Sequence, residues 1–291
     1  MKAAVRIGVP AATLAILVWR VGTGPFLDGL RTVDGRALAA AAGLAVLTTV
    51  CCAWRWRIVA RGLGTELPLG TAVAAYYRSL FLNVTLPGGV LGDVHRGISH
   101  GRDTRDVGRG LRAVAWERSA GQVVQAVLTV AVLLALPSPV HWLVPAVAVG
   151  LLVGGAGVVL ATRAWPRLRR DLRDAVLPRR AWPAITLASA LIVAGHVLTF
   201  LIAARTAGAT APASEVLPLA LLVLLAGALP NVGGWGPREG VTAWAFAAAG
   251  LGASRGVATA VVYGVMVFVS TLPGAAVLAV DWLRREGGRH A

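Results

Sequence analysis

Six long apolar segments limit what this sequence can fold into. Each is close to the 20 or so apolar residues that an α-helix needs to cross the ~30 Å hydrocarbon core of a bilayer. Hydrophobic residues make up 57% of the chain and charged residues only 14%, whereas a soluble domain carries about 25% charged residues. The sequence therefore predicts an all-α polytopic membrane protein with about six transmembrane helices, at approximately 5–22, 37–60, 113–136, 142–161, 184–204 and 257–280.

Two further apolar stretches, at about 69–92 and 216–250, are interrupted by proline and glycine. Proline and glycine free backbone N–H and C=O groups that lipid cannot satisfy. Such breaks persist at membrane depth only inside protein or beside a water-filled cavity. We therefore expect both stretches to form re-entrant hairpins, each a short helix, a broken tip and a second short helix.

The arginines predict the orientation of the chain. The net charge is +15, and residues 96–112 hold five arginines and residues 163–180 seven, whereas 137–141 hold none. By the positive-inside rule the arginine-rich segments and both termini are expected on the cytoplasmic side. Because these arginines lie between apolar blocks, topology and anionic lipid headgroups explain them, and we expect no nucleic-acid partner.

This orientation predicts one membrane domain, 1–291, built from two repeats of opposite orientation. Repeat A is 1–136, with the hairpin at about 69–92, and repeat B is 142–285, with the hairpin at about 216–250. Paired broken segments in inverted halves indicate a transporter-type binding site near the membrane midplane.

The first break carries candidate ligand contacts. Gly88 and Gly89 permit positive φ and close approach of the backbone to a ligand. Asp93 and Arg96 are three residues apart and share a helix face, where they would hold a zwitterionic headgroup or lock the hairpin by pairing with each other. Arg78, on the first arm, would meet phosphate or anchor the helix.

The second break carries the adjacent charges Arg238 and Glu239, with Trp235 in its glycine-rich tip. Ionisable groups inside a membrane are costly and are functional by default. Arginine suits phosphate because its planar guanidinium donates two parallel hydrogen bonds. The alternative is that both side chains reach the external water.

Glu117 and Arg118 lie at the start of the third apolar segment. Adjacent helical residues point about 100° apart, so we expect them to pair with different partners. Candidates for Glu117 are Arg96 or Arg238, and for Arg118 they are Asp93 or Glu239. The alternative is that both extend to the cytoplasmic interface.

Some aromatic and histidine residues have simpler expected roles. Trp54 and Trp56 lie near a predicted helix end and are expected in an interfacial aromatic belt. His95 and His100 are expected in solvent. His196 lies within a predicted span, where a helix–helix hydrogen bond is favoured over a proton relay.

Motifs of nucleotide, hydrolase and metal chemistry are missing from the sequence. It has no Walker A loop, no G-x-S-x-G element and no H-E-x-x-H element. Cys51 and Cys52 are adjacent within an apolar run, and vicinal cysteines rarely bridge. We therefore expect no enzyme activity, cofactor or metal.

At the motifs described above, the sequence resembles the family of the lysylphosphatidylglycerol synthase transmembrane region, as a stand-alone member without the synthase domain. The resemblance implies a polytopic protein of the bacterial inner membrane that binds or moves a phospholipid or glycolipid, with two re-entrant segments meeting near the membrane centre. The substrate-binding residues expected from the motifs and the resemblance are Arg78, Asn83, Pro87, Gly88, Gly89, Asp93, Arg96, Glu117, Arg118, Asn231, Gly233, Gly234, Trp235, Gly236, Arg238 and Glu239.

The expected function is that of a lipid flippase or transporter whose polar cavity lies between the two hairpins. The alternatives are a proton- or ion-coupled transporter of a small solute, and an accessory subunit or enzyme acting on a lipid-linked sugar. The expected partners are anionic or zwitterionic membrane lipids, with a homo-oligomer as a further possibility.

Overall fold

A computed structural model describes residues 24–86, 88–136, 138, 140–227 and 236–287, which form helices and their connections without a β-strand. Five helical segments are long and apolar enough to cross a membrane, which confirms five of the six predicted spans. The remaining prediction, 5–22, lies outside the described residues. The five are α3 (Gly35–Gly62), α6 (Val107–Ala135), η1 (His141–Leu143) with α7 (Val144–Ala164), α9 (Ala181–Thr206) and α12 (Ala253–Gly287).

Each interrupted stretch forms a pair of short helices. The first pair is α4 (Leu69–Thr85) and α5 (Leu91–Asp103), and the second is α10 (Ala213–Ala226) and α11 (Pro237–Ala248). With 17 and 13 residues, α4 and α5 are about 26 and 20 Å long at ~1.5 Å per residue, shorter than the ~30 Å bilayer core. The helix–break–helix pattern matches the prediction, whereas re-entry into a membrane remains a prediction.

The first pair extends further than predicted, because α5 continues to Asp103. We expected the hairpin to end near residue 92 and residues 96–112 to form a cytoplasmic segment. Hydropathy missed α5 because its polar side chains, including Asp93, Arg96 and His100, are buried against protein.

Glycines let α5 pack closely against its neighbours. A Cβ atom on Gly92 would overlap the backbone carbonyl of Ser79 in α4, and one on Gly101 would overlap Val107 in α6. A Cβ atom on Gly110 of α6 would overlap the backbone of α5 in return. Small residues allow this close approach of helix backbones in membrane proteins, and here they fix α5 between α4 and α6.

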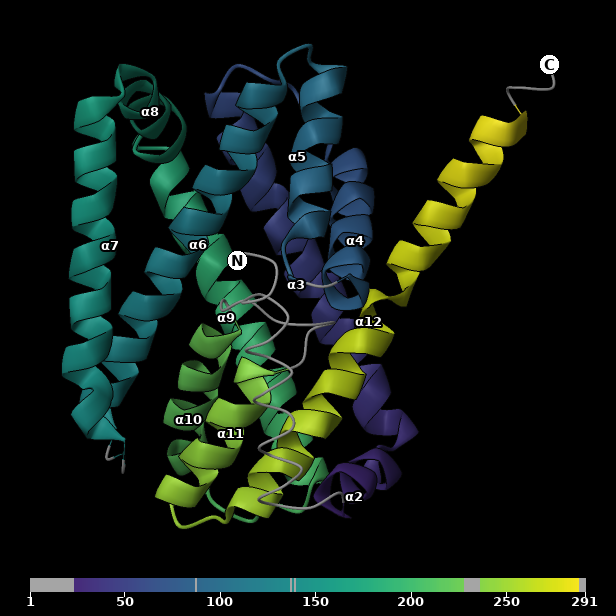
Figure 1. Ribbon diagram of the computed structural model, residues 1–291, viewed down its shortest axis with the longest axis vertical. Coiled ribbons are helices and arrows are strands. Elements are labelled where there is room, and N and C mark those ends of the chain that lie inside the picture. The colour runs from purple at the N-terminus through teal and green to yellow at the C-terminus, as the bar shows by residue number, and fades with distance from the viewer. Residues whose placement is uncertain (1–23, 87, 137, 139, 228–235, 288–291) are drawn as a thin grey trace, which may run out of the picture.

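The long helices pack around a central pair, α3 and α9, and α12 crosses beside α4, α9 and α11. Helix α7 lies at the periphery, where it packs mainly on α6 and α8 (Pro166–Asp171) (Figure 1). The order of one long helix, two short helices and one long helix occurs twice, as α3–α6 and as α9–α12. This order agrees with two repeats, and their inverted relation remains a prediction.

The arginine-rich connections gather at one end of the bundle, which we call the arginine-rich end. Figure 1 shows the α5–α6 connection, α8 and the C-terminal end of α12 at this end, with α2 (Gly24–Thr32) and the α11–α12 connection at the opposite end. In the same view α4 and α5 occupy the half near the arginine-rich end, and α10 and α11 the other half.

Candidate functional site

The centre of the candidate site is Glu117, whose side chain is fully buried in α6. Its Oε1 accepts hydrogen bonds from Arg55 Nε and Nη2 in α3, at 2.9 and 2.5 Å, and from the Tyr76 hydroxyl in α4 at 3.0 Å. Its Oε2 accepts from Arg96 Nη2 in α5 at 3.2 Å. One carboxylate therefore joins four helices, and Glu117 does not extend to the interface.

Asp93 is the second buried carboxylate and lies in the first turn of α5. It pairs with Arg96 Nη2 at 2.9 Å and with Arg118 Nη2 at 2.5 Å. The Ser79 hydroxyl and the Asn83 side-chain amide of α4 also donate to it, at 3.1 and 3.0 Å. Of the predicted partner pairs, Arg96 with Glu117, Arg118 with Asp93, and Asp93 with Arg96 form.

Arg96 links the two carboxylates and is itself held between aromatic rings. Its guanidinium carbon lies 4.4 Å from the centre of the Trp56 ring and 4.0 Å from that of Tyr76. Its Nε and Nη1 are buried and have no hydrogen-bond partner among the described residues. Cation–π contacts with the two rings stabilise the charge that these nitrogens carry.

Two expectations from the sequence are wrong at this point. Trp56 is 1% exposed, so it covers Arg96 instead of lying in an aromatic belt. His100 is buried rather than solvated, 3.2 Å from the Thr65 hydroxyl and with its ring against Trp56. Both errors arise because proximity to a helix end does not reveal which side of the helix is covered by protein.

Asn83 connects the arms of the first hairpin. Its Oδ1 accepts from the Gly92 backbone N–H at 2.8 Å, while its amide nitrogen donates to Asp93. Gly88 and Gly89 have φ of 103° and 68°, the left-handed region that glycine tolerates best. This confirms the expectation of positive φ at the first break and gives Asn83 and Asp93 a structural role in it.

The joined side chains of Arg55, Asp93, Arg96, Glu117 and Arg118 are called the charge network below. Its three arginines and two carboxylates carry a formal charge of +1. Four members are buried, whereas the Arg118 side chain is 40% exposed. Arg118 is therefore the most exposed member of the network.

The second break contributes a separate ion pair. Arg238 donates to Glu239 Oε1 from Nε and Nη2, at 3.0 and 2.6 Å, and its guanidinium carbon lies 5.0 Å from the centre of the Tyr263 ring. Glu239 is fully buried, and its Oε2 accepts from the Gly236 backbone N–H at 2.6 Å. Glu239 therefore caps the start of α11. The N-terminal end of a helix favours a negative charge at this position.

Arg78 pairs with Asp281 of α12 at 2.6 Å. In this conformation it anchors α4 to α12, which agrees with the second of its two expected roles. Five other predicted site residues lie outside the described part of the chain: Pro87, Asn231, Gly233, Gly234 and Trp235.

The sequence interpretation missed Arg55 and Tyr76. Arg55 also donates to the Ser189 hydroxyl of α9 at 2.9 Å, so it ties the charge network to the central helix pair. An arginine inside the predicted span 37–60 is itself a signal of function, and it went unused because the neighbouring tryptophans suggested an interface. Tyr76 carries no comparable signal.

A small cavity of about 70 Å³ lies between α3, α9 and α12. Its lining includes His196 and the hydroxyls of Thr48, Thr49, Thr199 and Ser270. The volume corresponds to about two water molecules at ~30 Å³ each, so it does not accommodate a lipid headgroup. Among the described residues, no group of three or more His, Cys, Asp and Glu side chains is placed to hold a metal ion.

Comparison with known proteins identifies the family of this chain. A search of the curated proteins finds no match. The model of the family described as the lysylphosphatidylglycerol synthase TM region matches residues 3–274, which include both helix pairs and the whole charge network. The chain therefore belongs to the family of the lysylphosphatidylglycerol synthase TM region.

Proposed function

We propose that the protein binds a lipid with a phosphate-containing headgroup and moves it between the two leaflets. The family connects the chain with lipid or lysylphosphatidylglycerol metabolism or transport. The observation that carries the proposal is the charge network, a largely buried cluster that joins α5 of the first helix pair to α3 and α6 and has one more arginine than carboxylates. The proposal includes no catalytic step.

The cost of burying the network supports a role beyond stability. Desolvation of buried ion pairs often cancels their attraction, so apolar residues of similar volume stabilise a protein as well or better. Ionisable groups within membrane segments accordingly tend to mark substrate or ion pathways. We infer that Arg118, the exposed member, meets the lipid phosphate and releases Asp93 as it does so.

A transport role also requires the ion pairs to exchange partners. Asp93 accepts from two arginines and Glu117 from two, so losing one partner leaves each carboxylate paired. The α4–α5 hairpin can then shift against α6 without leaving a buried charge alone. Arg238 and Glu239 form a second, largely buried ion pair, on α11 of the other helix pair.

The test is transbilayer movement of a fluorescent phosphatidylglycerol in liposomes that contain the purified protein. Protein-free liposomes give the background rate, and a glycosylated diacylglycerol with the same label, whose polar headgroup lacks phosphate, tests the need for phosphate. Faster movement of the phosphatidylglycerol alone supports the proposal. A rate equal to that of protein-free liposomes contradicts it.

A second candidate is proton- or ion-coupled transport of a small solute. His196 at the small cavity favours it, because an ionisable side chain within a membrane segment tends to mark an ion or substrate pathway. If phosphatidylglycerol moves at the same rate with and without an imposed pH gradient, this would count against coupling of transport to protons through this cavity.

A further inference from the structure

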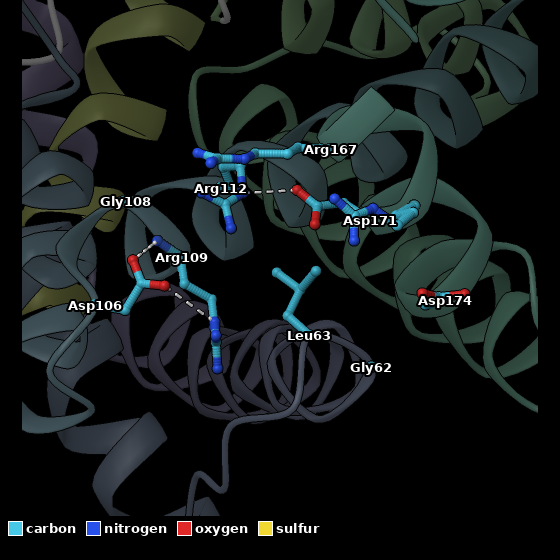
Figure 2. A pocket seen from close by; sticks show the side chains of 10 residues that line it. Gly62, Leu63, Asp106, Gly108, Arg109, Arg112, Arg167, Asp171 and Asp174 are labelled. Atoms are coloured by element: carbon cyan, nitrogen blue, oxygen red, sulfur yellow. Dashed lines mark hydrogen bonds and ion pairs between the residues drawn. The ribbon is translucent and has the colours of Figure 1, made fainter. Parts of the chain in front are cut away.

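A polar pocket of about 550 Å³ lies at the arginine-rich end, between the C-terminal end of α3, the N-terminal end of α6, and α8. Figure 2 shows its lining, with the Arg112–Asp171 pair joining α6 to α8. The volume is within the ~300–1,000 Å³ usual for ligand sites. Four arginines line it, namely Arg109, Arg112, Arg167 and Arg170.

The pocket has more positive than negative groups. Arg109 pairs with Asp106 at 3.3 Å and Arg112 with Asp171 at 2.7 Å. Asp174 is the remaining acid, so four arginines face three aspartates, a formal charge of +1. Within the described residues Arg167 and Arg170 have no ion-pair partner. Two guanidinium groups are therefore available for an anion.

An apolar groove of about 260 Å³ lies between α6, α7 and α9. Trp116, Ala120 and Val123 of α6 line one wall, and Val158 of α7 and Ile185 of α9 line others. Helix α7 presents mainly exposed apolar side chains. In a bilayer these would face acyl chains, and so would the groove that α7 borders.

The groove continues the pocket along one face of α6. Arg109 and Arg112 line the pocket, and Trp116, Ala120 and Val123 line the groove. The spacings of three and four residues place all five on one side of a helix. The π-helical segment η2 (Leu172–Val176) borders both spaces, with Asp174 at the pocket and Val176 at the groove.

We propose that the pocket and the groove together form the site where one anionic phospholipid docks from the adjacent leaflet. Its phosphate lies between Arg167 and Arg170, which suit a phosphate because arginine donates in a fork, and one acyl chain fills the groove past Trp116. This inference rests on the proposed function and makes the site the entrance for the transported lipid. The positive charge of the pocket and the apolar lining of the groove together select a phospholipid over a soluble anion.

The pocket is tested by native mass spectrometry of the purified protein titrated with dioleoylphosphatidylglycerol in detergent. The variant Arg167→Gln/Arg170→Gln removes the two available charges, and Arg169→Gln/Arg173→Gln removes two exposed charges from the same segment outside the pocket. We expect affinity to fall about a hundredfold in the first, because each of the two charge-assisted contacts contributes about tenfold. The control should stay within about twofold.

The groove is tested separately by filling it. Ala120→Trp places a large side chain in the groove, whereas Val127→Trp adds the same side chain at an exposed position of α6 outside it. We expect only Ala120→Trp to lose phosphatidylglycerol binding while both variants remain monodisperse. Unchanged binding in Ala120→Trp would show that a headgroup alone occupies the pocket, and it would overturn the proposal.

The same variants separate this inference from the proposed function. If wild-type protein moves phosphatidylglycerol in liposomes while the pocket variant and its control bind it equally well, the docking site is wrong and the function stands. If the pocket variant loses binding but wild-type protein moves no lipid, the docking site is correct and the transport proposal fails.

Discussion

Replacing Glu117 with glutamine is expected to destabilise the protein strongly. The change removes one of two carboxylates among three arginines, so the formal charge of the network rises from +1 to +2. The side chain is 0% exposed, so water cannot solvate the unpaired arginine charge. Breaking a buried ion pair costs about 3–5 kcal/mol. At about 2–4 °C per kcal/mol for a chain of this size, the melting temperature should fall by roughly 6–20 °C.

The assay is thermal unfolding in detergent, followed by tryptophan fluorescence. The matched control is Glu66→Gln, an exposed position where a substitution should change stability by less than about 0.5 kcal/mol. The double variant Arg55→Met/Glu117→Met restores the formal charge to +1 and should recover part of the loss, since the two residues interact directly. A melting temperature for Glu117→Gln within about 2 °C of wild type would refute the reasoning.

Three further predictions follow from individual contacts. Gly121→Ala should cost about 1–3 kcal/mol in the same thermal assay because a Cβ atom there would overlap the Arg55 guanidinium. Gly157→Ala, with no atom within 4 Å, should not destabilise the protein and should stabilise α7 by up to about 1 kcal/mol. The pKa of Asp106 is lowered by the Arg109 backbone N–H and by the nearby arginine charge, so the carboxylate stabilises the fold at neutral pH and this effect is lost as acid protonates it. Asp106→Asn should therefore reduce the fall in melting temperature between neutral and acidic pH. An unchanged fall would contradict this role of Asp106. Arg238→Ala and Glu239→Gln should each abolish lipid movement in liposomes while the variants elute as folded protein, and full activity of both would exclude this pair from the site.

The sequence was sufficient for the elements whose signals are local. Length and hydropathy located α3, α6, α7, α9 and α12, and proline and glycine located both breaks. For Glu117 and Arg118 the sequence predicted two candidate partners each, because buried charges at membrane depth need partners. Only the fold shows that Arg96 and Asp93 are the candidates that pair.

The remaining features depend on tertiary packing. Hydropathy does not show that α5 is covered by α4 and α6, so its polar residues resembled a loop. The polar pocket combines residues near 62, 106–112 and 167–174, which no local pattern connects. Trp56 and Arg55 are adjacent in sequence but contact different partners, Arg96 and Glu117, because neighbouring helical side chains diverge by about 100°.

If the charge network acts on the lipid headgroup, it does so through its exposed arginine, Arg118. The most direct measurement is the rate of phosphatidylglycerol movement in liposomes with Arg118→Gln, compared with wild type and with Arg255→Gln, which removes an exposed arginine of α12. We expect a rate at least about tenfold lower for folded Arg118→Gln, since a charged hydrogen bond contributes about 1.5–3 kcal/mol, and a wild-type rate for Arg255→Gln. Equal rates in all three proteins would show that Arg118 does not act on the lipid.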